Sequence, residues 1–231
     1  MNFDYYTHVK QQLATQDYIK TLASLCIKDG RDIVKLKDVS SKLKVSNAAV
    51  SDMVKKLMKD GLVFNHPYKG IELTDCGWQM GRRLIRHHRL WEVFLHQALS
   101  VPWDEVHKEA EHLEHAASDA LMDRIDEYLG FPKVDPHGNP IPTASGELTF
   151  NDAEIPLVEG VKGEVYYVTR FESMDSSYLN YLSQNGFAIG VSIKVLERFE
   201  FDQSLLGDMN GHHLQFSPAV AKQIFVTNQC E

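Results

Sequence analysis

The nine residues 107–115, HKEAEHLEH, hold three histidines and three glutamates, all of which can carry a proton or bind a metal ion. On a helix, side chains three, four or seven residues apart share one face. Four of these groups follow such a spacing and form one stripe: His107, Glu111, Glu114 and His115. An apolar set runs beside the stripe, shifted by one residue: Val106, Ala110, Leu113 and Ala117. The stripe therefore borders the predicted buried face, where packing can hold metal ligands in place.

A second pair of the same kind precedes this segment. His88 and Glu92 stand four residues apart in a predicted helix over residues 75–100. Two antiparallel helices would bring this pair to the stripe, so the sequence predicts a metal site built from both. For the nonapeptide alone the alternative is a solvated polar face, which is commoner than a metal site. The HExxH spacing of zinc proteases is absent, as are the GxSxG, P-loop and GxGxxG motifs. The spacing still allows a carboxylate-bridged dimetal hydrolase.

A helix-turn-helix pattern lies upstream of both segments. Apolar spacing predicts three helices and a turn before the third: residues 3–29, 38–43 and 47–59, with the turn at 44–46. Ser46 or Asn47 can cap the third helix. Two β-prone runs flank residues 66–70 and predict a hairpin. This order of elements is typical of a winged helix-turn-helix domain, whose second motif helix enters the major groove of DNA.

The residues expected to face DNA are short and carry no arginine. From the third helix they are Ser46, Asn47, Ala48, Ser51 and Asp52. Hydroxyl groups and helix N-terminal amides suit phosphate contacts, and the Ala48 methyl group suits a thymine methyl group. Three lysines would release counterions from DNA: Lys55, Lys56 and Lys69. The alternative is an ordinary helical core segment with solvated lysines.

The rest of the chain divides into a helical part, a linker and a β-rich tail. After the helix over residues 75–100, a second long helix is predicted over residues 104–129. Residues 131–156 are rich in proline and lack periodicity, so we interpret them as a linker. From residue 158 onward, β-prone runs surround one short helix near residues 176–184, which predicts a small barrel-like domain.

Charge is divided unevenly along the chain. The 231 residues carry a formal net charge of −8, which argues against general polyanion binding. Residues 1–75 nevertheless hold 12 Lys and Arg against 9 Asp and Glu, a net charge of +3. Residues 104–160 hold 3 against 14, a net charge of −11. The first segment suits a nucleic-acid surface, and the second suits divalent cations.

Cysteine usage and hydropathy bound the cellular location. Three widely spaced cysteines without a CxxC pair argue against a disulfide framework or a thiolate zinc site: Cys26, Cys76 and Cys230. They fit a reducing cytoplasm. The first residues lack the cationic start and apolar run of a signal peptide. No stretch approaches the roughly 18 apolar residues that a transmembrane helix needs, so no membrane association is expected.

The chain resembles the diphtheria toxin repressor and manganese transport regulator family of metal-dependent bacterial repressors over nearly its whole length. The segments that carry this resemblance are VSSKLKVSNAAVSDMVKKLMKDGLV, RHHRLWEVFL, VHKEAEHLEH and DPHGNPIP. It implies a mainly α fold with small β elements. The implied parts are a winged helix-turn-helix DNA-binding domain over 1–74, a helical dimerisation and metal-binding domain over 75–142, a linker over 143–156 and a C-terminal SH3-like (FeoA-like) β-barrel over 157–231.

The resemblance also implies a homodimer with two metal sites in each subunit. The first site would use Asp17, Glu111, Glu114 and His115. The second would use His88, Glu92 and His107 with an acidic ligand from the tail. Asp175 is the best candidate for that ligand, and Glu172 is the other.

Two departures from the family pattern bear on which metal ion is bound and on the geometry of its site. Asp17 and Glu111 stand where iron-type members carry methionine and cysteine, and their hard oxygen donors favour Mn²⁺ while also suiting Fe²⁺. Lys20 stands where manganese-type members without the tail have a second acid, which argues against the paired two-metal geometry of those members.

The implied function is non-enzymatic. It is repression of metal-uptake genes through metal-dependent binding to double-stranded operator DNA in the cytoplasm. The alternatives are a metalloenzyme, such as a hydrolase that uses the His/Glu cluster, and a winged-helix regulator that senses an organic ligand.

Overall fold

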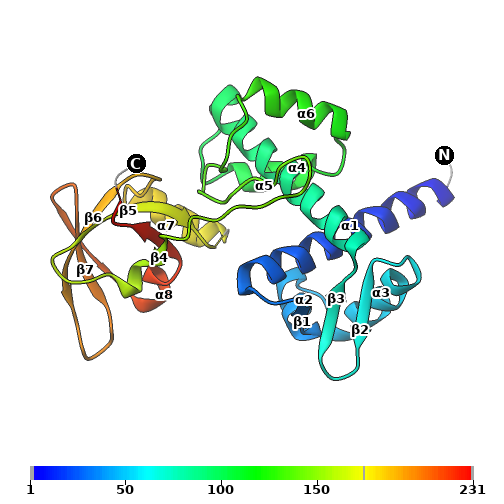
Figure 1. Ribbon diagram of the computed structural model, residues 1–231, viewed down its shortest axis with the longest axis horizontal. Helices are drawn as coiled ribbons and strands as arrows, with labels where there is room; N and C mark the ends of the chain where they lie inside the picture. The colour runs from blue at the N-terminus through cyan, green and yellow to red at the C-terminus, as the bar shows by residue number, and fades with distance from the viewer. Residues whose placement is uncertain (1–2, 174, 230–231) are drawn as a thin grey trace. The chain divides into compact units, whose positions relative to one another are not determined.

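The computed structural model describes residues 3–173 and 175–229 (Figure 1). The chain divides into two compact units, and each collects segments that are distant in sequence. The first unit comprises Met1–His88, Glu111–Asp123 and Pro142–Glu147. The second unit comprises Arg89–Ala110, Arg124–Ile141 and Leu148–Glu231. Each unit has its own hydrophobic core.

A winged helix makes up most of the first unit (Figure 1). Its elements are α1 (Phe3–Asp29), β1 (Ile33–Val34), α2 (Leu36–Leu43), α3 (Asn47–Lys59), β2 (Val63–His66) and β3 (Gly70–Leu73). Strand β3 lies between β1 and β2 in an antiparallel sheet. The helices and all three strands supply the core, which includes Ile19, Val39, Val54 and Ile71. The helix-turn-helix and hairpin predicted from the sequence are confirmed.

Two local features of the sequence fix the turns of this domain. The Ser46 hydroxyl oxygen accepts a hydrogen bond of 3.2 Å from the amide of Ala49, so Ser46 is the N-cap of α3. Gly70 begins β3 with a φ angle of +140°, and a Cβ atom there would lie 2.3 Å from the carbonyl oxygen of Val34. Glycine is therefore needed where β1 pairs with the wing.

Three helices follow the wing: α4 (Asp75–Leu99), α5 (Val106–Leu113) and α6 (Asp119–Tyr128). The single helix predicted over residues 104–129 is wrong, because residues 114–118 are not helical. The amide of Ala116 bonds to the carbonyl of Leu113 at 3.1 Å, and the Ser118 hydroxyl accepts from the amide at the start of α6. This turn removes Glu114 and His115 from the helical stripe.

The second unit is built around a six-stranded antiparallel sheet with the order β4-β9-β5-β6-β7-β8. The strands are β4 (Ile155–Pro156), β5 (Val165–Phe171), β6 (Ser192–Arg198), β7 (Leu205–Met209), β8 (His212–Phe216) and β9 (Ile224–Thr227). The 3₁₀ helix η1 (Leu157–Glu159) and the helices α7 (Ser176–Gln184) and α8 (Pro218–Ala221) complete the unit. Its core includes Phe171, Phe187 and Phe216. The predicted β-rich tail and its short helix are confirmed, whereas β7 and α8 were not predicted.

Candidate functional site

A first group of metal-ligand types lies in the first unit, between α1 and the turn after α5. Asp17, Glu114 and His115 each place one ligand atom within 4.8 Å of the others, and we call them the N-terminal group. His115 Nε2 lies 2.9 Å from Asp17 Oδ1 and 3.4 Å from Glu114 Oε1. Its Nδ1 donates to Gln16 Oε1 at 2.7 Å. With Nδ1 bonded to Gln16, the other ring nitrogen, Nε2, faces two carboxylates, an arrangement that a metal cation would satisfy.

Glu111 was predicted as a fourth ligand of this group, but it lies on α5, whereas Glu114 and His115 lie in the turn that follows. It is exposed on α5, and it is not among the clustered ligands found in residues 3–173 and 175–229. In a continuous helix Glu111 and Glu114 would share a face, but α5 ends at Leu113. Its role as a ligand stays a prediction.

Glu114 has its second oxygen in a different environment. The Glu114 side chain is buried, and Oε2 lies 2.5 Å from both Lys20 Nζ and His88 Nδ1. Burial alone would raise the pKa of Glu114, but the hydrogen bond with His88 and the charge of Lys20 outweigh this and hold the pKa below its ordinary value. Glu114 is therefore ionised at neutral pH and available to a cation.

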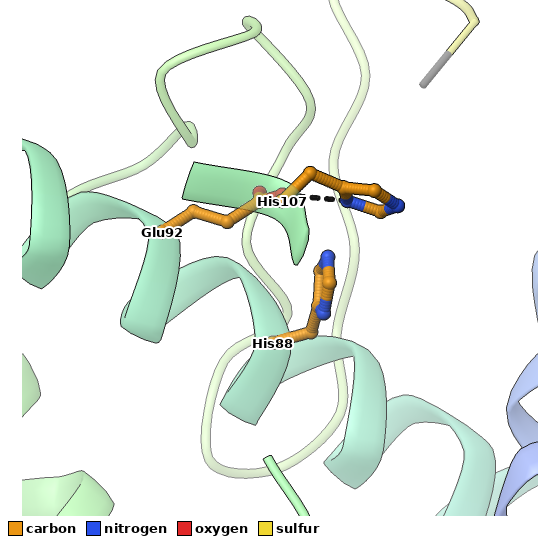
Figure 2. A group of neighbouring side chains, drawn as sticks. All are labelled: His88, Glu92 and His107. Carbon is orange, nitrogen blue, oxygen red and sulfur yellow. Dashed lines mark hydrogen bonds and ion pairs between the residues drawn. The ribbon is translucent and has the colours of Figure 1, made fainter. Parts of the chain in front are cut away.

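A second group contains the predicted ligands His88, Glu92 and His107 (Figure 2). His88 and Glu92 are one turn apart on the unbroken helix α4, and His107 is on α5. One ligand atom from each lies within 4.8 Å of the others. His107 Nδ1 is 2.9 Å from Glu92 Oε1, the contact drawn as a dashed line in Figure 2. The structure thus brings these three residues together as the i, i+4 spacing predicted.

A third group was missed by the sequence reasoning. Glu92, Asp135 and His137 are all buried and cluster within the same distance, and we call them the buried group. His137 Nε2 donates to the carbonyl oxygen of Trp103 at 2.8 Å. Its Nδ1 has no hydrogen-bond partner within the described part of the chain and lies 3.6 Å from Glu92 Oε2 and 3.9 Å from Asp135 Oδ1. Two buried carboxylates facing a ring nitrogen fit a divalent cation.

The electrostatics of the buried group combine its two carboxylates with His137 and with the guanidinium of Arg89, whose Nε lies 3.7 Å from Asp135 Oδ2. Burial lowers the pKa of His137, but Glu92 and Asp135 more than reverse this and raise it to about 9. Burial and the charge of Glu92 raise the pKa of Asp135. Both carboxylates gain from a nearby cation, and His137 holds a proton that a metal ion would replace. The only sequence signal was an Asp and a His two residues apart in the proline-rich segment.

The two acidic candidates from the tail have other partners. Asp175 caps α7, where its Oδ1 accepts from the amides of Ser177 at 2.9 Å and Tyr178 at 3.4 Å. Glu172 forms an ion pair of 2.5 Å with Arg170. Neither belongs to the three groups found among the described residues. Both assignments remain predictions.

The predicted DNA-facing side chains lie on α3 and the wing. Most of them are exposed: Ser46, Asn47, Ala48, Asp52, Lys55 and Lys69. Ser51 and Lys56 are half-buried. Lys55 pairs with Asp52 at 2.9 Å, while Lys56 Nζ lies 3.3 Å from the Thr15 hydroxyl of α1. Tyr68 was not predicted to contact DNA, and it is fully exposed at the tip of the wing.

No helix within the described residues is long and apolar enough to span a bilayer.

Family models match three consecutive parts of the chain. Residues 13–71 match the iron dependent repressor N-terminal DNA binding domain. Residues 74–143 match the iron dependent repressor metal binding and dimerisation domain, and residues 155–228 match the FeoA domain.

Individual relatives agree with these models. The chain is 28% identical over 193 residues to the diphtheria toxin repressor of Corynebacterium glutamicum, covering 79% of this chain and 83% of that protein. It is 34% identical over 116 residues to the transcriptional regulator MntR of Listeria monocytogenes serotype 4a, covering 50% of this chain and 80% of that protein. A solved manganese-dependent transcriptional repressor in complex with manganese is 35% identical, with a TM-score of 0.81 over 92% of this chain and 99% of that chain. The fold class predicted from the sequence is confirmed.

Proposed function

Because this chain belongs to the iron-dependent repressor family of metal-dependent, DNA-binding transcriptional regulators, we propose that it represses metal-uptake genes when Mn²⁺ is plentiful. The family consists of repressors, not enzymes, which removes the hydrolase alternative. The observation that carries the proposal is the N-terminal group, in which a residue of the DNA-binding domain and two residues after α5 converge on one cation-sized site.

The donor set supports Mn²⁺, with Fe²⁺ as the second choice. The three groups of ligand types contain only carboxylate oxygens and imidazole nitrogens. Such hard and intermediate donors suit these ions better than soft ones. One relative is named for iron-dependent repression and another solved relative contains manganese, which agrees with this choice.

The N-terminal group would control DNA binding through α1. Asp17 is two residues from Ile19, which is fully buried in the winged-helix core. A bound divalent ion supplies the positive charge that draws Asp17 to Glu114 and His115. Asp17 would thereby fix α1, and with it the winged helix, against the turn after α5. In a homodimer that contacts two successive major grooves, this would favour a separation of about 34–36 Å between the two α3 helices.

We place the second metal site at the buried group rather than at the tail acids. Glu92 presents one oxygen to His107 and the other to His137, so it can join both clusters in one site. Asp135 then provides the acidic ligand that was expected from the tail. His88 stays a proposed ligand because it lies one turn before Glu92 on α4.

The remaining assignments follow the family. We propose the three domains predicted from the sequence, homodimers formed through residues 75–130, and a cytoplasmic location. The DNA contacts proposed are the α3 and wing residues named above, since most of them are exposed.

A DNA-binding assay with the full chain tests the function. Operator DNA from upstream of its own gene or of metal-transporter genes should bind tightly with Mn²⁺ and weakly after chelation. Glu114→Ala should abolish this metal dependence, because it removes a buried ligand of the N-terminal group. Glu109→Ala is the matched control, since Glu109 is exposed on α5. DNA binding that is unchanged by chelation would instead favour a regulator that senses an organic ligand.

A further inference from the structure

Lys20 lies against the N-terminal group although it is not a metal ligand. It follows Asp17 by three residues on α1, which places both on one side of the helix. Asp17 approaches the Oε1 side of Glu114 through His115. Lys20 Nζ lies 2.5 Å from Glu114 Oε2 and 3.1 Å from His88 Nδ1. The carboxylate of Glu114 thus has two residues of α1 near it: the acidic Asp17 on its Oε1 side, through His115, and the basic Lys20 on its Oε2 side.

Burial makes this contact energetically important. The side chain of Glu114 is 2% exposed and that of Lys20 is 17% exposed. A buried carboxylate without a nearby positive charge is strongly destabilising, because its surroundings replace water poorly. Lys20 supplies that charge from within the chain. A protonated lysine has three hydrogen-bond donors and no lone pair, so it can neutralise Glu114 but cannot ligate a metal ion.

We infer that Lys20 is a built-in cation that neutralises Glu114 before metal binds and weakens metal binding, so that it sets the ion concentration to which the protein responds. This inference rests on the proposed function, because it concerns the same N-terminal group. The ammonium on the Oε2 side repels a divalent ion held on the Oε1 side. In the metal-free chain the ammonium contacts Glu114 and His88, and it occupies the Oε2 side of the carboxylate.

Substitution of Lys20 in the full-length chain tests both effects. Lys20→Met removes the charge and keeps the length of the side chain, and Lys20→Arg keeps the charge. Lys10→Met is the matched control, since Lys10 is exposed on the same helix. The probe is Mn²⁺ alone, titrated by calorimetry into metal-free protein. Glu114→Ala identifies which part of the signal belongs to the N-terminal group.

The expected result is tighter binding to a less stable metal-free protein. Lys20→Met should bind Mn²⁺ at the N-terminal group about tenfold more tightly or better. Its melting temperature in chelator should fall by roughly 5 °C or more, because Glu114 loses its counter-charge. The rise in melting temperature on adding Mn²⁺ should be larger than in the wild type. Lys20→Arg and Lys10→Met should stay near the wild type in each measurement.

The outcomes separate this inference from the proposed function. Equal or weaker Mn²⁺ binding by Lys20→Met would overturn the inference, even with a lower melting temperature, because Lys20 would then be only structural. An unchanged melting temperature in chelator would overturn the neutralising role. A wild-type chain that binds no Mn²⁺ would refute the proposed function, while the measurements in chelator would still decide whether Lys20 neutralises Glu114.

Discussion

At the scale of single residues, two histidines support the metal assignment because a neighbouring group fixes which ring nitrogen faces the carboxylates. His115 donates from Nδ1 to Gln16, and His137 donates from Nε2 to the carbonyl oxygen of Trp103. In each ring the other nitrogen faces carboxylate oxygens. The partners are 99 and 34 residues away in sequence, so no local pattern could predict these contacts. The sequence predicted His115 as a ligand from its spacing and missed His137 altogether.

The raised pKa of His137 predicts how the stability of the metal-free protein depends on pH. The pKa is about 9 in the folded chain and about 6.5 in an unfolded one. The bound proton therefore stabilises the fold fully below pH 6.5, and this contribution is lost as the pH rises through about 9. In chelator, the free energy of unfolding from urea titrations should fall over this range by on the order of 3 kcal/mol more in the wild type than in His137→Gln.

A control and a second measurement sharpen this test. His96→Gln should keep the wild-type pH profile, since His96 is exposed. Because a metal ion replaces the proton on His137, the affinity of the buried group for Mn²⁺ should rise from pH 6.5 to 9. Identical pH profiles for His137→Gln and the wild type would mean that this ring does not hold the proton.

At the scale of elements, the segment DPHGNPIP is a structured turn and not a linker. Asp135 Oδ1 accepts from the amides of His137 at 2.8 Å and Asn139 at 2.9 Å. The carbonyl oxygen of His137 accepts from the amide of Phe171 in β5, and the Trp103 ring stacks on the Phe171 ring at 5.4 Å. An Asp that bonds to amides two and four residues later is a recognised turn signal. The prolines obscured it in the sequence.

Gly138 is needed for this turn to reach β5. Its φ angle is +84°, and a Cβ atom would lie 1.9 Å from the carbonyl oxygen of Thr169. Gly138→Ala should therefore reduce the free energy of unfolding by roughly 2–4 kcal/mol. It should also weaken Mn²⁺ binding at the buried group, because His137 is the preceding residue. Urea denaturation and calorimetric titration measure the two effects.

Gly163→Ala measures the cost of backbone strain alone, without the steric clash that an alanine would cause at position 138. Gly163 has a similar φ angle of +90°, but a Cβ atom there would have nothing within 4 Å. Its substitution should cost only about 1 kcal/mol, the strain of a left-handed alanine. Equal losses of stability in the two variants would show that contact with β5 does not constrain Gly138.

The break between α5 and α6 marks another limit of element prediction. Apolar spacing continues through residues 114–118, and two alanines there favour helix, so a single helix was predicted. The chain instead leaves the helix at Glu114, whose carboxylate contacts Lys20 and His88. Tertiary ion pairs here outweigh local propensity. Ser118, the residue before α6, was the only local sign of a new helix.

At the scale of the whole molecule, the sequence was sufficient for the fold class and family, because these depend on periodicity and on motifs of residue types. The sequence did not predict that segments of the two compact units alternate along the chain. Residues 111–123 join the first unit and residues 124–141 join the second, although both were assigned to one helical domain. That division depends on contacts such as the ion pair of Glu114 with Lys20, which are invisible in a linear pattern.

Charge distribution and metal sites together predict a thermodynamic coupling. The middle of the chain is strongly anionic, and the ligands proposed for the N-terminal group join α1 of the DNA-binding domain to the turn after α5. If Mn²⁺ increases the affinity for operator DNA by some factor, operator DNA must increase the affinity for Mn²⁺ by the same factor. For a regulator of this kind we expect a factor of about 5–150.

Two titrations measure this factor independently: DNA binding with and without Mn²⁺, and Mn²⁺ binding with and without operator DNA. Both should give one value for the wild type, and Glu114→Ala should reduce that value toward one because the link between α1 and the turn is lost. Duplex DNA of scrambled sequence serves as the control and should show much weaker coupling. A factor near one for the wild type with operator DNA would mean that the ion stabilises the protein without regulating DNA binding.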